Sequence, residues 1–104
     1  MIELYFDEPQ EFEDLFTVTN PRITNGIFNG IKEAFHAKKE IADLFRIYFG
    51  PDEDTDYYEI SLDDTQWAHA LDTCLKKYEE MEMFDDALDV YVFRKEFYTK
   101  YGPQ

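Results

Sequence analysis

Two segments rich in aromatic and β-branched residues flank an acidic loop, and this arrangement constrains the fold most strongly. Residues 44–49 read LFRIYF and residues 57–62 read YYEISL. Such runs, separated by a short polar loop, are typical of an antiparallel β-hairpin. The apolar residues within 40–49 also have helical spacing, so a helix there is the competing interpretation. We expect the hairpin, with residues 50–56 as its loop.

The N-terminal third of the chain predicts one further strand and two helices. Residues 2–6 alternate between apolar and polar side chains, as a short strand does. A proline in a first-turn position and a one-sided apolar stripe predict a short helix within residues 7–16. Asn20-Pro21 has the form of a helix cap followed by a helix start. Apolar side chains then recur every four residues, which predicts a helix over 21–38.

Two Asn-Gly pairs, at 25–26 and 29–30, compete with that helix because Asn-Gly is a strong signal for a tight hairpin turn. We prefer the helix because the apolar period continues through both pairs. Gly26 and Gly30 then lie on one face and allow another element to approach closely. Each glycine costs the helix about 1 kcal/mol relative to alanine.

The C-terminal half predicts a pair of helices. Asp63 and Gln66 fit a reciprocal helix cap, and they precede an apolar stripe over 64–80 that includes Trp67 and Cys74. A break over 81–84 leads to a last helix that ends near Tyr98, although the alternation in LDVYVF leaves a strand open there. The segment 67–91 resembles one helix pair of a tetratricopeptide repeat, which implies a helix hairpin.

Together these patterns predict one α+β domain over residues 1–104. A small antiparallel sheet, built from the hairpin at about 44–62 and the N-terminal strand 2–6, packs against three or four helices. The aromatic content of 18% supplies the apolar area that a core of this size needs.

The formal net charge of −14, from 24 acidic and 10 basic residues, constrains the partners. Such a chain repels nucleic acids and anionic membranes and attracts basic surfaces, so we expect no direct nucleic-acid or membrane binding. The single cysteine excludes an intrachain disulfide, and the N-terminus lacks the features of a signal peptide. We therefore expect a cytoplasmic protein.

Sequence motifs for catalysis or metal binding are incomplete. Asp52, Asp54 and Asp56 match the first ligand positions of a calcium-binding loop, but Tyr57 stands where that loop needs glycine. One cysteine and two histidines lack the spacing of a zinc site. Ser61 is the only serine and has no glycine-rich elbow around it. We predict no catalytic residue, no metal site, no cofactor and no enzymatic activity.

The acidic residues themselves are the remaining candidates. Many stand at predicted helix starts, where the helix dipole stabilises them. Two groups are not explained in this way: an acidic loop and the end of a predicted helix, where the dipole disfavours acids. These residues are Asp52, Glu53, Asp54 and Asp56 in the loop and Glu79, Glu80 and Glu82 at the helix end. We predict that both groups bind a partner, with Tyr57 and Tyr58 as aromatic anchors.

These observations predict a small acidic binding or regulatory protein that contacts a basic protein surface. The composition resembles that of small acidic proteins that imitate the DNA backbone, many of them encoded by bacteriophages. That resemblance implies a nucleic-acid-binding protein as the partner and a phage origin. The alternative is a structural or assembly subunit, in which exposed aromatic residues of the hairpin or the last helix form a homodimer.

Overall fold

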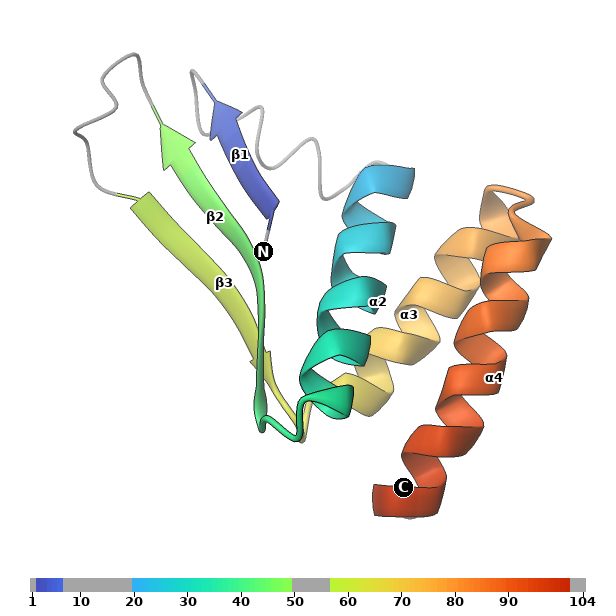
Figure 1. Ribbon diagram of the computed structural model, residues 1–104. Helices are drawn as coiled ribbons and strands as arrows, with labels where there is room; N and C mark the ends of the chain where they lie inside the picture. The colour runs from blue at the N-terminus through green and yellow to red at the C-terminus, as the bar shows by residue number, and fades with distance from the viewer. Residues whose placement is uncertain (1, 7–19, 50–56, 102–104) are drawn as a thin grey trace.

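The computed structural model describes residues 2–6, 20–49 and 57–101, and within these ranges it contains three strands and three helices (Figure 1). The strands are β1 (Ile2–Phe6), β2 (Ile41–Phe49) and β3 (Tyr57–Asp63), and the helices are α2 (Pro21–His36), α3 (Trp67–Glu80) and α4 (Phe84–Tyr101). Helix α2 lies beside the sheet, and α3 and α4 lie beyond it. The α+β prediction is confirmed at this level; the short helix predicted within 7–16 lies outside the described residues.

The sheet is mixed, so the prediction of an antiparallel sheet is wrong for one of its two pairings. Strand order is β1-β2-β3, with β1 parallel to β2 and β3 antiparallel to β2. The chain between β1 and β2 passes through α2, and parallel neighbours require a crossover of this kind. Alternation in residues 2–6 indicated a strand but carried no information about its direction. The competing helix over 40–49 is also wrong, since this segment is β2.

One face of the sheet packs into the core. Leu4, Phe45 and Ile47 point to the core and are buried. Strand β2 carries an irregularity between Asp43 and Phe45, where the register to β3 shifts. The extra residue lets neighbouring side chains, Leu44 and Phe45, both enter the core, which an even strand would not allow.

Helix α2 begins and packs as its sequence predicts. The Asn20 side chain accepts a hydrogen bond from the Arg22 amide at 2.9 Å, and Pro21 opens the helix. Gly26 faces Phe45, and Gly30 faces Leu44. The predicted close approach of another element at the two glycines is therefore confirmed, and the element is β2.

Helices α3 and α4 form the predicted helix hairpin, and the strand interpretation of LDVYVF is wrong. Before α3, the Gln66 side chain accepts a hydrogen bond from the Asp63 amide at 3.1 Å, while Asp63 accepts from the Thr65 amide at 3.0 Å. Regular helix begins at Trp67, whose indole N–H donates to the Leu62 carbonyl at 3.0 Å and so joins α3 to β3.

An aromatic cluster holds the three helices together. Phe35 of α2 makes an edge contact with the Phe93 ring at 5.3 Å between centroids, and Phe97 stacks on Tyr101 at 4.8 Å. Trp67 is fully buried beside Phe97. Aromatic pairs in these geometries add to the stabilisation that burial already supplies. The sheet and the helix hairpin are thus fixed to one common core.

Candidate functional site

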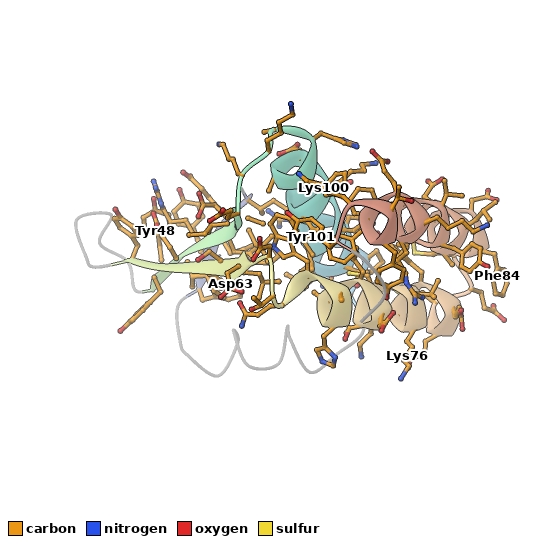
Figure 2. All side chains as sticks on the ribbon, turned by 90° about the horizontal axis from the view of Figure 1, so that it is seen from below. Tyr48, Asp63, Lys76, Phe84, Lys100 and Tyr101 are labelled. Atoms are coloured by element: carbon orange, nitrogen blue, oxygen red, sulfur yellow. The ribbon has the colours of Figure 1, made fainter. Side chains whose placement is uncertain are left out.

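Carboxylates gather where α3 turns into α4. The predicted residues Glu79 and Glu80 end α3, and Glu82 lies in the turn, so the structure brings these three together. Helix α4 adds further acids in its first two turns. We call the whole set the acidic turn; its members are Glu79, Glu80, Glu82, Asp85, Asp86 and Asp89. Figure 2 shows Phe84, which stands in the sequence between Glu82 and Asp85, at the end of the helix pair away from the sheet.

Residues 79–89 include six acids and no lysine or arginine. The Nζ atom of Lys77, one helical turn earlier, lies 3.9 Å from a carboxylate oxygen of Glu80. Arg94, on the same helix as Asp85, pairs instead with Asp72 at 3.1 Å. Since like charges held close together repel, the turn has a concentrated negative potential.

Glu82 has an unusual backbone conformation. Its φ is 57°, in the left-handed region that favours glycine. The Glu82 amide donates to the Glu79 carbonyl at 3.1 Å and the Met83 amide to the Tyr78 carbonyl at 2.8 Å, as in a Schellman motif. The carboxylate thus stands at a helix C-terminus, where the dipole disfavours negative charge. Glu82 is unfavourable both in conformation and in charge.

Lys38 has the same left-handed backbone conformation as Glu82, so the two helix ends can be compared. It follows α2 with φ 61°, and the Lys39 amide donates to the Ala34 carbonyl at 2.9 Å. Both α2 and α3 therefore end in the same motif without glycine. Lysine is the charge that a helix C-terminus favours, and glutamate is the opposite. The conformation is common to both ends, but only α3 combines it with a disfavoured charge.

An apolar stripe runs along the outer side of α4, next to the acidic turn. Phe84, Leu88, Tyr91 and Val92 are 64%, 59%, 49% and 58% exposed. The opposite side of α4, which includes Val90 and Phe97, is buried. The sequence predicted exposed aromatic residues of the last helix as the basis of the homodimer alternative, but it did not single out the stripe. The number of apolar residues in this helix was the available signal, because one helix face cannot bury them all.

Tyr57, one of the two predicted aromatic anchors, lies on the face of the sheet that points away from the core. Tyr5, Tyr48 and Tyr57 are neighbours in register across the three strands, and the Tyr5 and Tyr48 rings stack at 4.8 Å. Arg46 lies over the Tyr57 ring at 4.7 Å and donates to Glu59 at 2.8 Å. The pKa of Arg46 is raised, most strongly by its hydrogen bond with Tyr48 and next by its hydrogen bond with Glu59. The charged Arg46 side chain is therefore already paired within the sheet.

Those predicted residues that the structure describes do not form one site. Tyr58 points to the opposite face of β3 from Tyr57 and is exposed. Both tyrosines lie on the sheet, across α2 from the acidic turn (Figure 1). The loop residues Asp52, Glu53, Asp54 and Asp56 lie outside the described residues.

Three observations on the described residues bear on catalysis and metal binding. Cys74 is buried, and burial raises the pKa of its thiol to about 12, so it stays protonated and unreactive. A cavity of about 480 Å³ between α2 and β2 includes Arg22, Glu33 and Asp43 in its lining, but no histidine, serine or cysteine. No group of three or more His, Cys, Asp or Glu side chains in these ranges is arranged to hold a metal ion.

Among the described helices, none combines the length and the apolar character needed to cross a bilayer. A scan against protein-family models found no match for this chain, and searches of curated proteins and of solved structures found none either.

Proposed function

We propose that this chain is a small, non-enzymatic binding or regulatory protein whose acidic turn contacts a basic surface on another protein. The observation that carries the proposal is Glu82, an acid at a position where both the backbone and the helix dipole favour another residue. Residues kept at a cost to stability are more common at functional sites than elsewhere. Contact with lysine and arginine side chains would relieve the repulsion within the turn.

The partner class follows from the charge. Nucleic-acid-binding proteins present dense basic surfaces to bind phosphates, and a protein with a net charge of −14 is attracted to them over long distances. We therefore propose a nucleic-acid-binding protein as the partner, with inhibition by imitation of DNA as the mode of action. The lone, buried Cys74 fits the reducing cytoplasm as the compartment. The loop acids at 52–56 and the two tyrosines of β3 remain a predicted second contact.

The test compares two variants that change the net charge equally. In the first, Glu79, Glu80 and Glu82 are replaced by Gln; in the second, the exposed acids Glu33, Glu40 and Asp43 are replaced by Gln, Gln and Asn. Tagged proteins are immobilised, incubated with cell lysate at low salt and eluted with a salt gradient and, separately, with duplex DNA. Retained proteins are identified by mass spectrometry.

We expect wild type and the second variant to retain the same basic proteins, and duplex DNA to displace them. The first variant should release those proteins at clearly lower salt, since fewer ion pairs form. Equal losses in both variants would show that only net charge matters, and the proposed site would then be wrong.

One observation favours the alternative function, a structural or assembly subunit that forms homo-oligomers. It is the apolar stripe of α4, which exposes more large apolar side chain than isolated surface residues normally do.

A further inference from the structure

The apolar stripe of α4 has the spacing of a helix–helix interface. Phe84, Leu88, Tyr91 and Lys95 are separated by four, three and four residues, which places them along one seam. Val92 borders this seam, and the Lys95 ammonium lies 4.8 Å from the centre of the Tyr91 ring. The lysine stem therefore lies over the seam while its charge remains at the edge. Among the helices that the structure describes, α4 is the outermost (Figure 1), so its outer side can accept another helix.

The two halves of α4 carry opposite charges. Asp85, Asp86 and Asp89 lie in the N-terminal half, and Arg94, Lys95 and Lys100 lie in the C-terminal half. Figure 2 shows Phe84 and Lys100 at opposite ends of the helix. Glu96 is the exception to this division and is paired with His36 of its own chain at 3.1 Å. Arg94 is likewise paired with Asp72 of its own chain, so Lys95 is the base that borders the seam. An antiparallel copy of α4 would align acids with bases at both ends.

We propose that the outer side of α4 is a dimer interface whose occupant is the same side of α4 in a second copy, in antiparallel orientation. Leu88 of each copy then packs against Tyr91 of the other copy, and Asp85 of each lies close to Lys95 of the other. Two-fold symmetry makes each contact occur twice. This inference rests on the alternative function, homo-oligomer formation through the α4 stripe, and it involves neither the basic partner nor Glu82.

Charge complementarity favours a second copy over other occupants. A parallel copy would place acids against acids along the N-terminal halves. A uniformly basic helix from another protein would meet Lys95 at one end of the seam. Only a partner helix that is basic at one end and acidic at the other matches α4 along its length, and α4 itself has that pattern.

The interface is small, and this sets the expected affinity. One helix seam buries less than the roughly 800 Å² per partner of a standard interface, so we expect a dissociation constant on the order of micromolar.

Salt should affect the dimer through its net charge. Each copy carries a net charge of −14, which opposes association at low salt. Added salt screens that long-range repulsion, and it also strengthens apolar burial when the salt is sulfate. Dimerisation should therefore strengthen as salt rises, the opposite of the salt effect on a basic partner.

The test is a charge exchange followed by sedimentation equilibrium from micromolar to several hundred micromolar protein, at low and at high salt. Asp85→Lys and Lys95→Glu are made singly and together. Each single variant places like charges together at both ends of the seam, and we expect it to weaken dimerisation about tenfold. The double variant exchanges the charges, keeps the wild-type net charge, and should recover the wild-type constant to within about threefold.

Matched controls separate the seam from net charge. Glu33→Lys and Lys76→Glu change the charge by the same amounts at exposed positions on α2 and α3, and they should leave the seam intact. Circular dichroism verifies that each variant is folded. The proposal is overturned if wild type stays monomeric at every concentration and salt level, or if the double variant dimerises no better than the single ones. Neither result affects the proposed function, whose test depends on Glu79, Glu80 and Glu82.

Discussion

Gly26 of α2 lies directly against the Phe45 ring of β2. A Cβ placed at Gly26 would lie 2.9 Å from the Phe45 ring and 2.7 Å from the Ile2 Cδ1, closer than side chains pack. Glycine is therefore what allows the helix and the central strand to touch. Phe45 is fully buried, so its ring has little room to move away.

We expect Gly26→Ala to destabilise the protein by about 1–3 kcal/mol, because overpacking the core outweighs the gain of about 1 kcal/mol in helix propensity. Asn29→Ala, on the exposed side of the same helix, is the control and should stabilise slightly. Urea unfolding followed by circular dichroism measures both changes. If the Gly26 variant were as stable as the control, the close packing described for this position would be wrong.

Features that depend on the local sequence pattern could be predicted. Trp67 and Cys74 lie on the buried side of α3, as their spacing indicated, and Gly26 and Gly30 share the face that meets β2. The direction of β1 was not predictable from its five residues, because alternation is the same in parallel and antiparallel strands. Which strand neighbours which is decided by the crossover through α2.

The candidate site was predictable only in part. Glu79, Glu80 and Glu82 were found because their position at a helix end conflicts with the dipole. The left-handed φ of Glu82 was not visible, since a backbone angle depends on how the chain continues into α4. Exposed aromatic residues were expected on the hairpin or the last helix, but the outer stripe of α4 was not located, because spacing alone does not reveal which face of a helix its neighbours cover.

A hydrogen bond between Tyr78 and Asn25 joins α3 to α2, and the phenol donates to the side-chain oxygen of Asn25. Tyr78 is almost completely buried, so its hydroxyl depends on this partner. We expect Tyr78→Phe to cost about 1 kcal/mol. A double-mutant cycle with Asn25→Ala, measured by urea unfolding, should give a coupling energy of similar size. Additive effects of the two substitutions would contradict a direct bond.

Alkaline pH should destabilise the fold through Cys74. Burial keeps the thiol protonated in the folded state and raises its pKa from 9.0 to about 12, while the unfolded chain ionises near the ordinary value. The unfolded state therefore gains stability as pH rises above about 9, and folding loses roughly one kcal/mol per pH unit until the folded thiol also ionises. Burial likewise raises the pKa of Tyr78, which adds to the loss above its ordinary value of 10.0.

The measurement is the free energy of unfolding in urea between pH 8 and pH 10 for wild type and Cys74→Ala. The variant starts less stable at pH 8, because it leaves a small cavity. Its stability should nevertheless decline less steeply, since it lacks the thiol that ionises on unfolding. Parallel curves for the two proteins would show that Cys74 does not contribute to the alkaline transition.

Glycine should stabilise the chain at both left-handed helix ends, but more at Glu82 than at Lys38. Relief of the backbone strain contributes about 1 kcal/mol in each case. Glu82→Gly also removes a charge that the α3 dipole disfavours, whereas Lys38→Gly removes a charge that the α2 dipole favours, each about 0.3–1 kcal/mol. Thermal unfolding at low salt should therefore rank Glu82→Gly above Lys38→Gly, and the gap in stability should shrink at high salt because these charges are screened.

In the binding assay the order of the two variants should reverse. Glu82→Gly is expected to elute from the basic partner at lower salt, while Lys38→Gly should behave as wild type. A Glu82→Gly protein that gains stability and binds undiminished would show that the acid at this position has no part in partner contact.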